Sequence, residues 1–170
     1  MGLGAINPGC DCCGGIACAG CSGGRGPSQW QVTIDGIVND QCTGASGLNG
    51  TWILSNVGEC LWWYELSSAE RTGLQISTGS PAQNCFCRSN IDLVRIKLAI
   101  GGLASITVTI ELTEPVVTPC TGVNTYIFSV IYQTQVDCLD LVDQGIPFSS
   151  QSSVRGYNAA GGTCRITAIL

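Results

Sequence analysis

The sequence predicts an all-β protein, an antiparallel β-sandwich or jelly roll of about seven to nine strands. β-branched residues dominate segments in which apolar and polar side chains alternate, and turn residues interrupt these segments about every 8–12 residues. Cysteine and glycine are concentrated in residues 1–27, which lack such alternation. We therefore expect an irregular cysteine- and glycine-rich arm or knuckle over residues 1–27, followed by a β-sandwich domain over residues 28–170.

The expected strands follow the alternating segments in order along the chain. They cover residues 29–34, 51–54, 60–66, 92–100, 105–113, 124–133 and 164–170. The alternation is clearest in the fourth and fifth of these strands, which the Gly101-Gly102 pair joins. Pairing these two strands gives the sheet one apolar face and one polar face.

Three segments between the strands carry weaker signals. Residues 136–142 could form one short helix, which Gly145 would cap. Residues 143–162 are rich in serine and glycine, and we expect them to form a long ordered loop. Asn49-Gly50-Thr51 matches a glycosylation sequon, but we expect it to act as the turn before a strand.

The composition excludes several classes of function. The net charge is −5, only 11% of residues are charged, and Lys97 is the single lysine, so we expect no nucleic-acid partner. The chain has no histidine, which removes Ser-His-Asp and Cys-His catalysis. No apolar run approaches the roughly 18 residues of a membrane-spanning helix, so we expect no membrane partner. We expect a binding or structural protein and not an enzyme, with no catalytic residue.

The chain contains twelve cysteines, close to the share that is typical of disulfide scaffolds. We expect all of them to form structural disulfides, although spacing alone leaves the pairing open. Disulfides need an oxidising compartment, but residues 1–10 do not resemble a secretory signal peptide. We expect either a removed signal or oxidation after release from the cell, as in a virus particle. The twelve are Cys10, Cys12, Cys13, Cys18, Cys21, Cys42, Cys60, Cys85, Cys87, Cys120, Cys138 and Cys164.

A metal site is the alternative interpretation of the N-terminal cysteines. Cys18-x-x-Cys21 is half of a zinc knuckle, and two of Cys10, Cys12 and Cys13 could supply the other thiolates, for example Cys10 and Cys13. The same ligands could hold an iron–sulfur cluster. Because the second pair lacks the CxxC spacing, the expectation is disulfides without a cofactor, and zinc is kept as the alternative.

Three consecutive aromatic residues lie on the expected strand at residues 60–66. Alternation places Trp63 on one face and Trp62 with Tyr64 on the other, so at least one of them can lie near the surface. Burial under a neighbouring loop or under the arm is the first expectation. A subunit contact comes next, and a platform on which a sugar stacks comes last.

Three stretches of the chain carry a resemblance to a known group of proteins. They are Pro27-Ser-Gln-Trp-Gln-Val-Thr-Ile-Asp-Gly-Ile-Val, Leu48-Asn-Gly-Thr-Trp-Ile-Leu and Cys60-Leu-Trp-Trp-Tyr. Over roughly residues 10–65 and the final strand, the chain resembles uncharacterised cysteine-rich β proteins of tailed bacteriophages and environmental bacteria. The resemblance implies a structural role in a virion or outside the cell, and no catalytic residue comes with it.

Together these observations predict a non-enzymatic structural protein of a tailed-phage particle. It would belong to the capsid decoration or to the tail or fibre, and would bind other virion subunits, including copies of itself. The alternative is a secreted or surface-attached module that binds glycans through Trp62, Trp63 or Tyr64. The second alternative is a structural protein that binds zinc or an iron–sulfur cluster.

Overall fold

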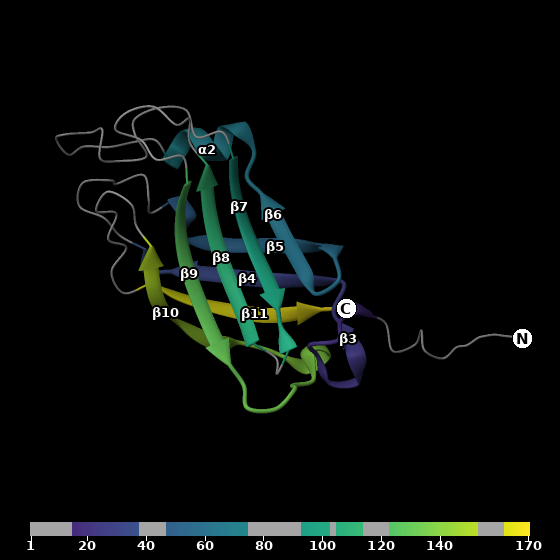
Figure 1. The fold of residues 1–170 in the computed structure, drawn as a ribbon. Coiled ribbons are helices and arrows are strands. Elements are labelled where there is room, and N and C mark those ends of the chain that lie inside the picture. Colours follow the sequence, from purple (N-terminus) through teal and green to yellow (C-terminus); the bar gives the residue numbers. More distant parts are fainter. Residues whose placement is uncertain (1–14, 38–46, 75–92, 103–104, 114–122, 153–161) are drawn as a thin grey trace, which may run out of the picture.

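The computed structural model describes residues 15–37, 47–74, 93–102, 105–113, 123–152 and 162–170 (Figure 1). Eight antiparallel strands form one closed barrel, in which each strand pairs with the strands before and after it in sequence. The last strand pairs with the first along its whole length and closes the barrel. The strands are β4 (Gln29–Asp35), β5 (Gly50–Gly58), β6 (Leu61–Glu65), β7 (Leu93–Ile100), β8 (Ser105–Thr113), β9 (Val123–Ile131), β10 (Gln144–Ser152) and β11 (Thr163–Ile169).

The prediction of an all-β, antiparallel fold is confirmed. The strands close into a single meander, whereas a sandwich would keep two separate sheets. The barrel nevertheless resembles a sandwich. In Figure 1, β7, β8 and β9 cross in front of β4, β5 and β11, so the barrel is flattened into two layers. An even number of antiparallel strands can close in this way. In the last part of the barrel, β10 pairs with β11 through residues 144–147 and with β9 through residues 148–152.

The alternation in β7 and β8 places apolar side chains inside the barrel. Ile96 lies opposite Ile110, and Leu98 lies opposite Val108, and all four are fully buried. On the outer side of the same pair, Lys97 lies opposite Thr109. The two faces predicted for this hairpin are therefore confirmed.

Trp30 and Trp62 are the largest side chains in the barrel interior, and both are completely buried. Their rings meet edge to face, an arrangement that aromatic pairs favour. Buried aliphatic side chains from the barrel strands pack in the same core. These include Val32, Ile34, Leu54, Val94, Ile96, Leu98, Ile106, Val108, Ile110, Ile146 and Ile166.

The structure corrects three predictions about the connecting segments. Residues 144–152, expected within a long loop, form β10; Pro147 and a register shift after Phe148 hide its alternation. The helix expected at residues 136–142 is only a 3₁₀ turn, η6 (Cys138–Asp140). The strand expected at residues 51–54 is longer, and the turn that follows it begins later, because β5 continues to Gly58.

An α-helix that was not expected, α2 (Ser68–Leu74), follows β6. The Ser67 hydroxyl accepts a hydrogen bond from the backbone N–H of Glu70, and the Glu70 carboxylate accepts one from the backbone N–H of Ser67. This reciprocal capping box satisfies N–H groups that the first helical turn leaves unpaired. Among the residues that the structure describes, no helix has the length and apolar character needed to cross a membrane.

The described part of the arm, residues 15–27, is called the N-terminal segment below. It contains the short strands β2 (Ile16–Ala17) and β3 (Arg25–Gly26), which pair with each other, and the 3₁₀ turn η1 (Ser22–Gly24). In Figure 1, β3 lies beside the C-terminus, while α2 lies at the opposite end of the barrel. The N-terminal segment is therefore part of the folded unit, packed against one end of the barrel.

Candidate functional site

Two disulfides join the N-terminal segment to distant parts of the chain. Cys18 is bonded to Cys60, in the turn between β5 and β6, and Cys21 is bonded to Cys138 in η6. The bonded residues are 42 and 117 positions apart in sequence. Crosslinks that close loops of this length restrict the unfolded chain, and each stabilises the fold by on the order of 3–5 kcal/mol.

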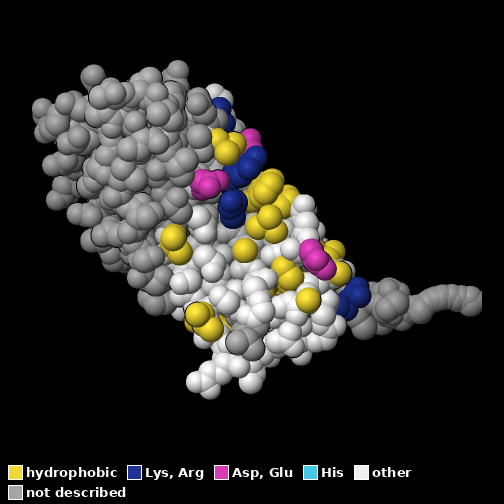
Figure 2. Space-filling view, in the orientation of Figure 1, with side chains coloured by type: hydrophobic (Ala, Val, Ile, Leu, Met, Phe, Trp, Pro, Cys, Tyr) yellow, Lys and Arg dark blue, Asp and Glu magenta, His cyan; other side chains and the backbone are white. Residues whose placement is uncertain are grey.

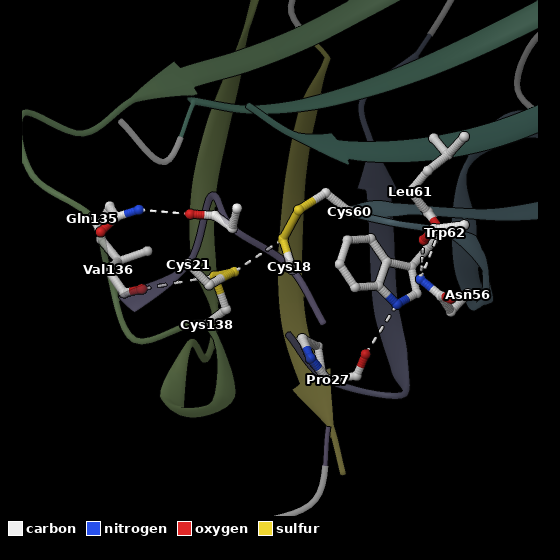
Figure 3. The surroundings of a disulfide bond; sticks show 12 residues. Cys18, Cys21, Pro27, Asn56, Cys60, Leu61, Trp62, Gln135, Val136 and Cys138 are labelled. Carbon is white, nitrogen blue, oxygen red and sulfur yellow. Dashed lines mark hydrogen bonds between the residues drawn. A yellow bond between two sulfur atoms is a disulfide. The ribbon is translucent and has the colours of Figure 1, made fainter. Parts of the chain in front are cut away.

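The two disulfides touch each other (Figure 3). The Sγ atoms of Cys18 and Cys21 are 3.6 Å apart, which is van der Waals contact between sulfur atoms. A tight turn brings them together, because the backbone N–H of Cys21 donates to the carbonyl oxygen of Cys18 at 3.1 Å. Cys18, Cys21 and Cys138 are buried, whereas Cys60 is partly exposed at the turn. These four cysteines are called the disulfide cluster below. Cys60 is the member of the cluster that is not fully buried.

Hydrogen bonds hold the N-terminal segment in place around this cluster. The indole Nε1 of Trp62 donates to the carbonyl oxygen of Pro27 at 3.0 Å. The backbone N–H of Ser22 donates to the carbonyl oxygen of Val136 at 2.7 Å. The side-chain amide of Gln135 donates to the carbonyl oxygen of Ala19, also at 2.7 Å. The segment is therefore held by both covalent and polar contacts with the barrel and with the chain that precedes η6.

Two glycines allow the N-terminal segment to approach the barrel closely. A Cβ atom on Gly26 would lie 2.9 Å from the ring of Trp62. A Cβ atom on Gly20 would lie 2.5 Å from the carbonyl oxygen of Gly101 in the turn between β7 and β8. Real Cβ atoms do not approach other atoms this closely, so the packing depends on both glycines.

The prediction of structural disulfides holds for four of the five cysteines that the structure describes. The fifth, Cys164 on β11, is a buried free thiol, which corrects its assignment to a disulfide. It lies opposite Ile34 of β4 and Ile146 of β10, and burial raises its pKa to about 12. Cys164 therefore packs as a small apolar side chain. The remaining seven, Cys10, Cys12, Cys13, Cys42, Cys85, Cys87 and Cys120, lie outside the described residues.

The zinc alternative depended on thiolates at Cys18 and Cys21. Both sulfurs are in disulfides here, and a disulfide sulfur has no thiolate charge to offer a metal. Cys10 and Cys13 lie outside the described residues. In the part of the chain that the structure describes, no three or more Cys, Asp or Glu side chains are grouped so as to hold a metal ion.

The three consecutive aromatic residues of β6 have different surroundings. Trp62 is buried inside the barrel beneath the N-terminal segment, the first arrangement expected from sequence. Tyr64 is partly buried, packs on Trp52 and donates its hydroxyl to the Glu70 carboxylate at 2.9 Å. Trp63 lies on the outer side of the barrel, on the face opposite to Trp62 and Tyr64, and the alternation predicted that these faces differ.

Trp63 is the centre of a mixed apolar and charged surface, called the Trp63 face below. The guanidinium carbon of Arg95 lies 4.3 Å from the centroid of the Trp63 ring, a cation–π contact. Arg95 also forms an ion pair with Glu65 at 3.1 Å, and Lys97 forms one with Glu111 at 3.6 Å. Strand register places these side chains on one outer surface, in the row Ser55, Trp63, Lys97 and Thr109 and in the row Glu65, Arg95 and Glu111.

Figure 2 shows charged side chains gathered over this part of the barrel, with apolar side chains beside them. The exposed apolar residues of β5 are Ile53 and Val57, at 40% and 43% exposure. The side chains of Arg95 and Lys97 are only 29% and 28% exposed, because they lie along the sheet and contact Trp63 and Glu111. The surface is thus ordered by its own contacts before any partner binds.

Glu70 is the described carboxylate with the clearest electrostatic perturbation. The backbone N–H of Ser67 lowers its pKa below the ordinary 4.5, and Tyr64 adds a second hydrogen bond to the charged form. The pKa of Tyr64 is raised in turn, first by its hydrogen bond to Glu70 and then by burial. This pair was not predicted from the sequence, although the capping-box spacing Ser67-x-x-Glu70 is a known signal for a helix start.

These features define a class of protein: a closed antiparallel β-barrel with an apolar interior, braced at one end by two disulfides and carrying an ordered aromatic surface. Neither a protein-family model, nor a curated protein, nor a solved structure matches the chain significantly.

Proposed function

We propose that this protein is a non-enzymatic structural component of a virus particle, which acts through contacts between subunits. The Trp63 face carries the proposal. Trp and Arg are the residues that most often dominate the energy of protein–protein contacts, and here they are stacked on each other on one outer surface. Ile53 and Val57 extend the apolar area on the neighbouring strand.

The barrel interior supports action through the outer surface. Trp30, Trp62 and the surrounding aliphatic side chains are buried in it, and the interior of an eight-stranded barrel is just wide enough for side chains of this kind to occupy. A partner of this protein is therefore expected to bind outside the barrel. A second copy of the chain or another particle subunit fits a broad, ordered surface.

Arg95 favours a protein partner over a glycan at Trp63. Sugars stack on the open face of an aromatic ring, but the Arg95 guanidinium lies over this ring at 4.3 Å. A glycan on that face of the ring would have to displace Arg95 from Trp63 and disturb its ion pair with Glu65. A protein surface can instead pack around the stacked pair.

A place in a virus particle is supported by the disulfide cluster and by the sequence resemblance to phage proteins. Two crosslinks between distant segments slow unfolding, which suits a protein that must last without replacement outside a cell. The oxidised state also suits a particle released from the reducing interior of a cell.

The subunit contact is tested by the oligomeric state of the full oxidised chain. We expect wild-type protein to self-associate in light scattering coupled to size-exclusion chromatography, and Trp63→Ala to weaken association at least roughly 30-fold. Thr163→Ala is the matched control, on the exposed outer side of β11 three strands away from β6, and should associate as wild type does. A monomeric wild type at about 100 μM, or an unaffected Trp63→Ala variant, would contradict the proposed contact.

The particle is tested separately by analysing purified particles from the source culture. We expect the chain to be identified by mass spectrometry in particles that have been purified on a density gradient. On a gel run without reductant, its bands should move when reductant is added. Its absence from the particles, or sugar binding on a glycan array that Trp63→Ala abolishes, would overturn the proposed role.

A further inference from the structure

We propose that the disulfide cluster is a thiol–disulfide exchange site, at which a thiol from outside the chain joins Cys60 and a new Cys18–Cys21 bond forms. The proposal rests on the contact between two disulfides that share the Cys18-x-x-Cys21 turn. It is independent of the role in a particle.

Exposure selects the first sulfur to be attacked. Cys60 is partly exposed in the turn between β5 and β6, whereas its partner Cys18 and the whole Cys21–Cys138 pair are buried. Because Cys60 is the residue of the four that has exposure to solvent, we expect an incoming thiolate to attack its Sγ atom first. It forms a mixed disulfide there, the Cys18–Cys60 bond breaks, and Cys18 leaves as a thiolate.

The Cys18 thiolate then has an electrophile in direct contact. Its Sγ atom is 3.6 Å from that of Cys21, and attack on Cys21 forms the Cys18–Cys21 bond while the Cys21–Cys138 bond breaks. Cys138 leaves as a thiolate and takes up the proton that the incoming thiol released. Two intramolecular disulfides thus become one intramolecular disulfide, one mixed disulfide and one thiol, with no net oxidation or reduction.

The backbone turn from Cys18 to Cys21 is compatible with the new bond. The hydrogen bond from Cys21 to the Cys18 carbonyl closes a four-residue turn, in which the end Cα atoms lie within about 7 Å. Disulfides span Cα separations of about 4.4–6.8 Å. Forming the Cys18–Cys21 bond therefore needs little movement of the turn.

The exchange would release the N-terminal segment from the barrel. Cys18 and Cys21 provide its two covalent links to Cys60 and Cys138, and both links are lost in the same reaction. Hydrogen bonds such as that from Ser22 to Val136 would remain as the local restraint. The site would thus couple the thiol concentration of the surroundings to the opening of one end of the barrel.

Cys164 does not compete in this reaction. It is buried on β11, and its raised pKa keeps the thiol protonated and therefore unreactive at neutral pH.

Peptide mapping of the full oxidised chain tests the proposal, with reduced glutathione as the probe. The reaction is stopped with acid at successive times, free thiols are alkylated, and crosslinked peptides are identified by mass spectrometry. We expect glutathione on Cys60, a Cys18–Cys21 bond and an alkylated Cys138 to appear at the same rate and in equal amounts. Glutathione on Cys60 with an alkylated Cys18, or glutathione first on Cys138, would overturn it.

Two variants separate the steps. In Cys21→Ser/Cys138→Ser, the second disulfide is absent, so glutathione on Cys60 should leave Cys18 as an alkylatable thiol. In Cys60→Ser, Cys18 is a thiol from the start, and at least a tenth of the molecules should carry the Cys18–Cys21 bond without any glutathione. A Cys60→Ser variant that keeps only the Cys21–Cys138 bond would contradict the exchange. The wild-type mapping decides the matter if either variant fails to fold.

The same reaction should change backbone protection. After treatment with glutathione, we expect amide hydrogen exchange at Ser22 to be at least tenfold faster, while the β7–β8 pair is unchanged. Unchanged protection at Ser22 in fully exchanged protein would show that the segment stays closed and would overturn the proposed opening.

Discussion

The indole rings of Trp30 and Trp62 meet edge to face inside the barrel, with their centroids 5.9 Å apart and their planes at 89°. Their N–H groups differ in surroundings. Trp62 donates to the carbonyl oxygen of Pro27 at 3.0 Å, whereas the buried Nε1 of Trp30 has no hydrogen-bond partner among the described residues. Comparing the two residues therefore separates the contribution of indole packing from that of the indole hydrogen bond.

Replacing each tryptophan by phenylalanine should have unequal effects. Both changes remove ring volume from the core, but only Trp62→Phe also loses a hydrogen bond and leaves the Pro27 carbonyl unpaired. We expect Trp62→Phe to lower the free energy of unfolding by about 1–2 kcal/mol more than Trp30→Phe does. Urea denaturation followed by circular dichroism measures the difference, and an equal or reversed effect would argue against this bond as an anchor of the N-terminal segment.

Gly26→Ala tests the close approach of the N-terminal segment to the barrel. The added methyl group would lie 2.9 Å from the Trp62 ring, so we expect a loss of about 1–3 kcal/mol in stability. Gly58→Ala is the matched control, because a Cβ atom there meets nothing within 4 Å, and it should stay within about 0.5 kcal/mol of wild type. Thermal denaturation of the oxidised proteins compares them, and equal midpoints would contradict the packing.

Asn49 should be a structural residue and not only part of a sequon. Its side-chain oxygen accepts from the backbone N–H of Ile37 at 2.9 Å, and its amide nitrogen donates to the Ile37 carbonyl at 2.8 Å. Asn49→Ala leaves both backbone groups without a partner and should cost about 1–3 kcal/mol. Thr51→Ala, in the same sequon but on the exposed side of β5, should cost under about 1 kcal/mol. Hydrogen exchange at the Ile37 amide should accelerate only in Asn49→Ala.

The capping box should make part of the stability depend on pH. The folded-state pKa of Glu70 lies below its ordinary 4.5, so its contribution is complete above pH 4.5 and is lost as the pH falls through the folded value. Glu70→Ala should therefore lower stability by about 1 kcal/mol or less at pH 7, and the difference from wild type should shrink on acidification. Glu70→Gln keeps an acceptor for Ser67 and should show a smaller loss with little pH dependence. A gap between wild type and Glu70→Ala that widens below pH 4 would be inconsistent with the lowered pKa.

Local patterns predicted most of the strands. The bounds of β8 agree residue for residue with the expected segment at residues 105–113, because its alternation is unbroken. β10 was missed because Pro147 and a register shift interrupt its pattern, and neighbouring strands supply the pairing that it needs. α2 was missed although its capping box is local, since the helix is only seven residues long and has little apolar periodicity.

Some features of the candidate sites could likewise be predicted from local sequence, and others depended on contacts between distant residues. Alternation alone placed Trp63 and Trp62 on opposite faces, because a strand turns successive side chains to opposite faces, and the structure decided that Trp62 is the buried one. The stacking of Arg95 on Trp63 depends on the register between β6 and β7, which are separated by 27 residues of chain between Glu65 and Leu93. Likewise, the sequence contains the CxxC spacing of Cys18 and Cys21, but it could not show that these residues form disulfides with Cys60 and Cys138.

By itself, the sequence determined that this chain forms antiparallel strands with one apolar and one polar face, since each strand's pattern is set by adjacent residues. Only the tertiary structure decided the closure of the barrel, the partners of Cys18 and Cys21, and the burial of Trp62 under the N-terminal segment. Each of these depends on residues far apart in sequence meeting at one point, and that meeting is governed by the packing of the whole core.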